Sequence, residues 1–323
     1  MHASEQLIPL SAIDTNDDFY RISGSPPLDA LFESIRNIGL VNIPVLQVKG
    51  ETYRIVCGFK RIHACGILGM EKIYCRVLDR STSELDCLKM AIADNAMASR
   101  PGILEEARAV TKLGALCTPE EDLPRLARPL GIDINTDLAE KYRLLCALPE
   151  RLQHLVENNV ISMKIAIELG SLEAGDSLVM ADLFETLRPT ASQQKEILSN
   201  LKATSAVMNH RIADLLELPG VCEVFTNQEV DRKQKIRILR WEIRKIRYPH
   251  IARFESRFNQ NLGKMGLRKG ISLIPPRDFE SPVYTFSIDF TNTVELGRKA
   301  DWLKQICESR ELKSLLHREI EDT

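Results

Sequence analysis

The stretch VCGFKRIHACGILGM, residues 56–70, decides how the N-terminal part of this chain is expected to fold. Gly58 interrupts an apolar run, Lys60 and Arg61 follow at once, and an apolar period then resumes. This pattern is typical of a strand that turns into a helix at the glycine. Backbone N–H groups at the start of a helix attract anions, and adjacent cations add to that attraction. The stretch therefore predicts an anion-binding site directly after Gly58.

The segments around this stretch predict an α+β domain that ends near residue 100. Strands are expected where apolar and β-branched residues gather, and helices where apolar residues recur every three or four positions. On these criteria we predict strands at residues 7–10, 44–48, 53–56 and 72–78, and helices at residues 28–38, 62–68 and 83–97. The polar residues 14–27 predict a loop, residues 49–51 predict a turn, and Gly39 is expected to end the first helix.

Composition indicates a globular protein of two or three domains, because the chain has 323 residues, 44% of them hydrophobic and 27% charged. No apolar run approaches the roughly 20 residues that a membrane-spanning helix needs. The first ten residues lack the pattern of a signal peptide, so we expect a cytoplasmic protein. The eight cysteines include no C-x-x-C pair, which disfavours zinc and thioredoxin-like sites and favours buried, reduced thiols.

Residues 101–218 are expected to form an all-α domain that contains a helix-turn-helix. A short helix at residues 123–130 is followed by a turn at Gly131 and a second helix at residues 136–147. In a helix-turn-helix the first residues of the second helix contact base edges in the major groove. The candidates for DNA contact are Asn135, Thr136, Glu140 and Lys141. A helical hairpin without a DNA-binding role would show the same pattern, and this alternative stays open.

Residues 219–323 are expected to form a small α+β domain. A long basic helix is predicted at residues 228–262, with a possible break at Pro249, and a hairpin and a last helix follow it. The hairpin strands are expected at residues 271–274 and 283–290, and the last helix at residues 294–318. Thirteen Lys and Arg stand against three Asp and Glu in residues 231–269, so the rest of the chain is acidic. This asymmetry indicates a surface for an anionic partner, although a solvated helix face would show it too.

Several blocks in this order resemble the ParB family of DNA-segregation proteins. SIRNIGLVNIPV (34–45) is similar to the family's S-I-x-x-x-G-L-x-x-P-I-x-V, and GFKRIHA (58–64) is similar to its G-E-R-R-x-x-A. DNAMA (94–98), followed by ILEEA (103–107), resembles E-N-L-Q-R followed by P-I-E-E-A. The helical part adds LARPLG (126–131), YRLLCALP (142–149) and SMKIA (162–166). The resemblance covers about residues 5–170, and it is the order and spacing of the motifs that make it specific.

The resemblance implies a ParB/sulfiredoxin-like N-terminal domain, followed by a helical DNA-binding domain. Family members bind CTP with Mg²⁺ in the N-terminal domain, close around DNA as a clamp after meeting a palindrome, and often hydrolyse CTP slowly. Carried over to this chain, the resemblance places the phosphates at Gly58, Lys60 and Arg61, with Ser34 and Gly39 as further candidates for cofactor binding. It assigns Asp94 to Mg²⁺ and Asn95 to the positioning of metal or water for hydrolysis.

The sequence departs from the family at three positions that bear on this site. Phe59 replaces a Glu, Lys60 replaces an Arg, and Ala98 replaces the Arg of E-N-x-x-R. Lysine lacks the two-pronged fork of arginine, so phosphate binding is expected to be weaker. Sulfiredoxins share the fold but need a cysteine where Phe59 stands, so their chemistry is not expected here.

Three functions are consistent with these observations. The first is a homodimeric partition protein, associated with the nucleoid or a plasmid, that binds palindromic DNA, works with a ParA-type ATPase and is switched by CTP. The second is a related transcription regulator or mobile-element factor with a degenerate nucleotide pocket. The third is an enzyme on the same fold, such as a kinase or a nuclease. In the first function residues 219–323 would serve as a dimerisation domain.

Overall fold

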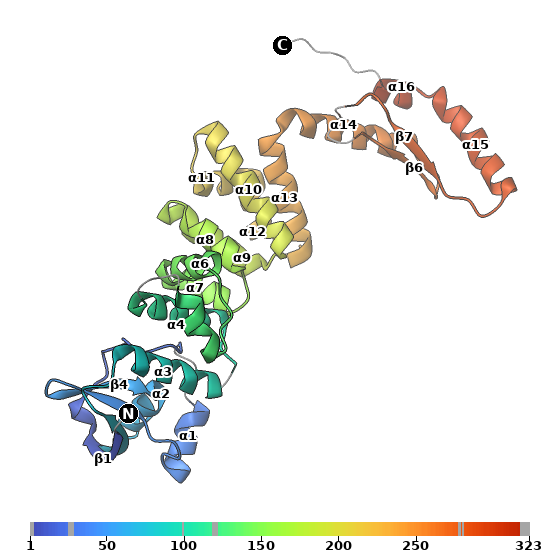
Figure 1. The fold of residues 1–323 in the computed structure, drawn as a ribbon. Coiled ribbons are helices and arrows are strands. Elements are labelled where there is room, and N and C mark those ends of the chain that lie inside the picture. Colours follow the sequence, from blue (N-terminus) through green and yellow to red (C-terminus); the bar gives the residue numbers. More distant parts are fainter. Residues whose placement is uncertain are drawn as a thin grey trace. The chain divides into compact units, whose positions relative to one another are not determined.

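A computed structural model describes residues 3–24, 29–98, 100–117, 122–276, 279 and 281–316. The chain divides into two compact units, Met1–Ala191 and Ser192–Thr323 (Figure 1). We predicted three domains with divisions near residues 100 and 218, and that layout stays a prediction. In the part of the chain that the structure describes, no helix has both the length and the apolar character needed to cross a membrane.

The first unit begins with a mixed sheet of five strands in the order β1-β5-β3-β4-β2. These strands are β1 (Ala3–Pro9), β2 (Ile13–Asp14), β3 (Val45–Lys49), β4 (Thr52–Cys57) and β5 (Lys72–Leu78). β1 pairs with β5 and β3 pairs with β4 in antiparallel fashion, whereas β3 with β5 and β2 with β4 are parallel. Pro9 ends β1 at the edge of the sheet, where its missing N–H breaks no ladder.

Helices cover both faces of this sheet. α1 (Asp29–Ile38) and α2 (Phe59–Ile67) contribute Ile35 and Ile62 to a buried cluster with Ile55 and other alternate strand residues. Side chains alternate along a strand, so Arg54 points to the opposite face. There it pairs with Glu84 of α3 (Glu84–Ala98) at 3.4 Å. The sheet is thus enclosed between α1 and α2 on one side and α3 on the other.

Helices alone follow in the described remainder of the first unit. They are α4 (Ile103–Leu116), α5 (Leu123–Ala127), the 3-10 helix η3 (Arg128–Leu130), α6 (Thr136–Ala147), α7 (Glu150–Glu157), α8 (Met163–Gly170) and α9 (Ala174–Leu187). α4 packs against both α5 and α6. Ser162 caps α8 through its side chain, which accepts a hydrogen bond from the Ile165 N–H, as its position predicts.

Among the described residues, the second unit holds seven helices and a hairpin with its own core. Its elements are α10 (Ala191–Met208), α11 (Ile212–Leu216), α12 (Pro219–Thr226), α13 (Arg232–Arg247), α14 (Pro249–Met265), β6 (Ile271–Ile274), β7 (Thr285–Ile288), α15 (Thr293–Cys307) and α16 (Arg310–Leu316). β6 and β7 pair in antiparallel fashion. Phe258, Leu273 and Ile306 bring α14, the hairpin and α15 into one buried cluster.

Most predicted elements of regular structure are confirmed, with four differences. The possible break at Pro249 in the basic helix is confirmed, because α13 ends and α14 begins there. The predicted last helix, in contrast, is divided at residues 308–309. The two-residue strand β2 and the short helices α11 and α12 were not predicted, because so few residues carry no visible period. Leu28, the predicted start of α1, and residues 317–318 lie outside the described residues.

Candidate functional site

The turn from β4 into α2 has the geometry that the sequence predicts. Gly58 has φ 92° and ψ 30°, a left-handed conformation that side chains with a Cβ rarely adopt. A Cβ at this position would lie 3.2 Å from the Cα of Pro44. No side chain caps the start of α2, so its first backbone N–H groups have no capping acceptor. Such a helix start is suited to an anion.

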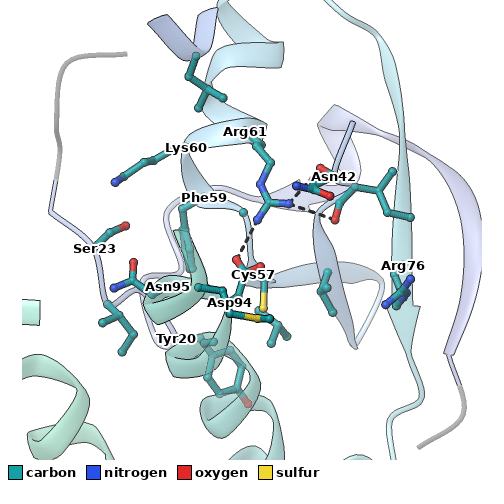
Figure 2. Close-up of a pocket in the computed structure, with 18 of the residues that line it drawn as sticks. Tyr20, Ser23, Asn42, Cys57, Phe59, Lys60, Arg61, Arg76, Asp94 and Asn95 are labelled. Carbon is teal, nitrogen blue, oxygen red and sulfur yellow. Dashed lines mark hydrogen bonds and ion pairs between the residues drawn. The ribbon is translucent and has the colours of Figure 1, made fainter. Parts of the chain in front are cut away.

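A cavity of about 870 Å³ lies against this helix start (Figure 2). Its walls come from seven parts of the first unit. They lie within residues 20–23 of the β2–α1 loop, residues 41–45, residues 56–61 and residues 91–97 of α3, with Leu31 of α1, Glu5 of β1 and Arg76 of β5. Gly58, Lys60, Arg61, Asp94 and Asn95 all line this cavity, so five of the predicted residues lie together.

Arg61 is already bound within the protein. Its guanidinium donates to Asp94 Oδ2 at 2.8 Å and to the Asn42 carbonyl at 3.0 Å, and its side chain is 19% exposed. Lys60 makes no hydrogen bond or ion pair with any residue that the structure describes, and its side chain extends away from that of Arg61 (Figure 2). The two cations therefore differ: Lys60 has a free ammonium group, whereas Arg61 has to share its guanidinium with any incoming anion.

Asp94 and Asn95 lie on the same helix but in different surroundings. The Asp94 side chain is 44% exposed and carries the Arg61 ion pair. Asn95 Nδ2 is buried and has no hydrogen-bond partner among the described residues. In the same part of the chain, no three His, Cys, Asp or Glu side chains gather into a metal site. A metal ion beside α3 would have the Asp94 carboxylate as its ligand from that helix and would need further ligands from a bound molecule.

Ser34 and Gly39 lie away from the cavity lining. Ser34 is exposed on α1. Gly39 follows α1 with φ 78°, and its N–H donates to the Ile35 carbonyl, as expected of a residue that ends a helix. The cavity lining includes Leu31 before these two residues and Val41 after them, but neither Ser34 nor Gly39. Their assignment to cofactor binding stays a prediction. The side chain of Ala98 lies outside the described residues.

Cys57 also lines the cavity, directly before Gly58. Burial raises the pKa of its thiol to about 12, so the sulfur stays protonated at neutral pH. A thiol becomes nucleophilic only as the thiolate. The cavity therefore lacks the activated cysteine that sulfiredoxin chemistry would require. Cys65, Cys75, Cys87 and Cys117 are buried free thiols too, as predicted.

Tyr20 and Ser23 are cavity-lining residues that the sequence did not indicate. They belong to a stretch whose polarity predicted only a surface loop. The sequence did contain one signal that this loop packs against the protein, the adjacent aromatic residues Phe19 and Tyr20. Large aromatic side chains in a polar segment are expected to be buried against another part of the chain. Tyr20 is fully buried, and its hydroxyl donates to Gln47 Oε1 at 3.2 Å.

The predicted helix-turn-helix consists of α5 with η3, a turn at Gly131 and α6. Gly131 has φ 79°, and the turn ends at Asn135, whose Oδ1 accepts from the Leu138 N–H at 2.8 Å. Thr136 is exposed at the start of α6. Glu140 pairs with Arg143 at 2.8 Å, and Lys141 pairs with Asp137 at 2.5 Å. Such exposed pairs are weak, so both side chains can exchange partners.

The basic residues of the second unit fall into two groups. On α13, Arg240 pairs with Glu196 at 2.5 Å and Lys245 pairs with Glu242 at 3.0 Å. On α14, the side chains of Arg253, Arg257 and Lys264 are exposed and have no ion pair among the described residues. Their spacing of four and seven residues puts them on one face of the helix. These three side chains form a stripe along α14. Arg232, Lys233 and Arg237 of α13 are exposed too and have no ion pair among the described residues.

Comparison with known proteins agrees with the N-terminal geometry. Residues 2–96 match the ParB N-terminal domain family. This part of the chain is therefore similar to ParB N-terminal domains. The ParB resemblance inferred from the motifs is therefore confirmed, and so is the α+β fold of this region.

Two ParB relatives come from Thermus thermophilus. A probable plasmid-partitioning protein ParB is 33% identical over 111 residues, which are 33% of this chain and 35% of the relative. The chromosome-partitioning protein Spo0J is 30% identical over 151 residues, which are 47% of this chain and 54% of the relative. The matches therefore span about a third and about half of the relatives' own lengths.

A truncated ParB from Caulobacter crescentus, solved in complex with CTP-gamma-S, aligns with 56% of this chain and 98% of its own. The sequence identity is 21% and the TM-score is 0.26. A similarity this low supports no conclusion about this chain.

Proposed function

We propose that this protein is a ParB-type DNA-binding protein of plasmid or chromosome partition, and that the cavity at Gly58 binds a nucleoside triphosphate, CTP by resemblance. One observation carries the proposal. In a ParB N-terminal domain, an uncapped helix start with a free lysine lies against a cavity of about 870 Å³. A volume between about 300 and 1,000 Å³ is typical of a small-molecule site.

The phosphates would lie at the start of α2. There the backbone N–H groups and the Lys60 ammonium offer donors, and Arg61 adds a cation when it turns from Asp94. Mg²⁺ fits this site only together with the phosphates, because it usually keeps few protein ligands and takes the rest from substrate and water. Asp94 would be that ligand, and Asn95 would position metal or water. When bound, the ion would neutralise phosphate charge. Slow hydrolysis of CTP stays a prediction.

DNA would be bound by the helical part, with α6 in the major groove and Asn135, Thr136, Glu140 and Lys141 at the base edges. A homodimer would match a palindromic site, because half-sites mirror the two-fold symmetry of the protein. The α14 stripe would add contacts to phosphate that carry no sequence preference. A ParA-type ATPase as partner stays a prediction too.

Calorimetry with ATP, GTP, CTP and UTP, each with Mg²⁺, tests the nucleotide. We expect heat with CTP. Lys60→Ala combined with Arg61→Ala should weaken CTP binding by a factor of about a hundred or more, because each charge-assisted contact contributes about 1.5–3 kcal/mol. Lys72→Ala is the matched control, since this lysine is exposed on β5 and does not line the cavity. Full retention of affinity in the double variant would reject the phosphate site.

One observation favours the alternative of a regulator with a degenerate pocket. Arg61, the second cation of the cavity, is already paired with Asp94. Asp94 is also the only carboxylate of α3 that lines the cavity among the described residues. Absence of heat with every nucleotide, together with specific DNA recovered by crosslinking and sequencing, would support that alternative. A phosphorylated product or cleaved DNA would instead support an enzyme.

A further inference from the structure

The loop between β2 and α1 forms part of the cavity wall and is also held by the helical region. Tyr20, Ile22 and Ser23 of this loop line the cavity. On the other side of the loop, Lys112 of α4 donates through Nζ to the Asp18 carbonyl at 2.8 Å and to the Phe19 carbonyl at 2.6 Å. One short segment is therefore in direct contact with both the cavity and α4.

The sheet holds the same loop through an ionic cluster. Asp17 Oδ2 lies 2.6 Å from both Lys49 Nζ and Arg54 Nε, and its side chain is only 10% exposed. The Arg54 guanidinium lies over the Phe19 ring, 4.6 Å from its centroid. Burial alone would raise the pKa of Asp17, but its hydrogen bonds with Lys49 and Arg54 outweigh burial and lower it to about 2. The base of the loop is thus anchored, while Tyr20, Ile22 and Ser23 line the cavity.

α4 is joined in turn to α6. The Tyr142 hydroxyl of α6 donates to Glu106 Oε2 of α4 at 2.9 Å, and Tyr142 is buried. Ile22 of the loop and Gly131, the glycine at the turn before α6, also line one smaller cavity of about 240 Å³. One route of direct contact therefore leads from the loop to the predicted recognition helix, through Lys112 and Glu106 of α4.

We propose that Lys112 is a positioning residue that couples occupancy of the Gly58 cavity to DNA binding by α6. The proposal rests on the proposed function. A ligand that displaces Tyr20 or Ser23 also displaces the carbonyls of residues 18 and 19, and Lys112 then has to follow them or lose two hydrogen bonds. Coupling between two sites requires an element whose contacts differ between two states. The proposal assigns this role to the two hydrogen bonds of Lys112. Arg108 assists, since its guanidinium lies 3.4 Å from the Ile22 carbonyl.

The test measures the coupling factor, which is the ratio of the CTP dissociation constants with and without the recovered DNA site, in the full chain with Mg²⁺. Couplings between sites are typically about 5- to 150-fold. We expect Lys112→Met, which keeps the length of the side chain but not its N–H donors, to bring this ratio close to one. Binding of CTP alone and of DNA alone should change much less. Lys112→Arg restores donors and should restore the coupling.

Lys164→Met is the control, because Lys164 is exposed on α8 and makes no hydrogen bond or ion pair among the described residues. Arg108→Met is a second variant in case Lys112→Met does not fold, and it should lower the coupling factor in part. A wild-type coupling factor in a folded Lys112→Met protein would overturn the inference, as would wild-type protein that binds both ligands without coupling. Wild-type protein that binds no CTP would instead overturn the proposed function.

Discussion

At the scale of single residues, Gly58 decides whether the anion site can exist. Its left-handed φ turns the chain sharply from β4 into α2, and its hydrogen atom leaves room for Pro44. Both features place the uncapped N–H groups of α2 at the cavity. A side chain at this position would have to bear a strained backbone and a contact of 3.2 Å at once.

We therefore expect Gly58→Ala to lower the free energy of unfolding by roughly 1–2 kcal/mol or more, because the left-handed conformation alone costs about that much for a residue with a Cβ. CTP affinity should fall as well. Gly66→Ala is the control in the same helix, since nothing lies within 4 Å of the added Cβ. That change should stabilise α2 slightly, as alanine favours helix over glycine by up to about 1 kcal/mol. Chemical denaturation measures the free energy of unfolding of the Gly58→Ala and Gly66→Ala variants. Equal changes in the two variants would contradict the role of Gly58.

At the scale of elements, α6 depends on its cap as much as on its exposed face. Ala139, Tyr142 and Leu145 are buried, and they fix the helix against the helical core. Asn135, which the sequence predicts to contact DNA, uses its side-chain oxygen to cap this helix. The amide nitrogen is the part of Asn135 that is left for a base. Loss of the residue would thus affect stability and DNA binding together, and the two effects have to be separated.

Asn135→Ala should lower the free energy of unfolding by about 1 kcal/mol, the usual effect of removing an N-cap. Asn135→Ser should keep the cap and most of that stability, because serine caps helices about as well. If Asn135 contacts a base directly, both variants should lose DNA affinity to a similar extent. Fluorescence anisotropy with labelled DNA measures this. DNA affinity that is retained in the serine variant would show that Asn135 acts only as a cap. Ser162→Ala, which removes the cap of α8, is the control for a loss of stability elsewhere.

At the scale of the whole molecule, charge is divided between the two units. The first unit carries the cavity and the predicted recognition helix, and the second carries the unpaired cations of α14. Positive charge that is neutralised by internal carboxylates, as at Arg240 and Lys245 of α13, releases few counterions when it meets DNA. The exposed stripe on α14 presents three cations on one helix face, an arrangement that suits phosphate.

Arg253→Ala combined with Arg257→Ala should flatten the dependence of DNA affinity on salt. Each lost phosphate contact reduces the slope of log affinity against log salt by about 0.9, so a decrease of about 2 is expected. The effect should be equal for specific and unrelated DNA, because phosphate contacts carry no sequence information. Arg298→Ala with Lys304→Ala removes the same charge from α15, where both side chains are exposed, and should leave the slope nearly unchanged. An unchanged slope in the α14 variant would remove this stripe from the DNA surface.

The sequence by itself determined the local structure of this protein. Gly58, Gly131 and Pro249 each mark a turn or break at the predicted position, because φ preferences and apolar periods are properties of a few neighbouring residues. Only the tertiary structure decided which charged side chains are held by partners elsewhere in the chain. The Arg61–Asp94 pair, the capture of the β2–α1 loop by Lys112 and the pairing of Arg240 join residues 33, 93 and 44 positions apart. Such contacts depend on how the helices and the sheet pack, and no local pattern encodes them.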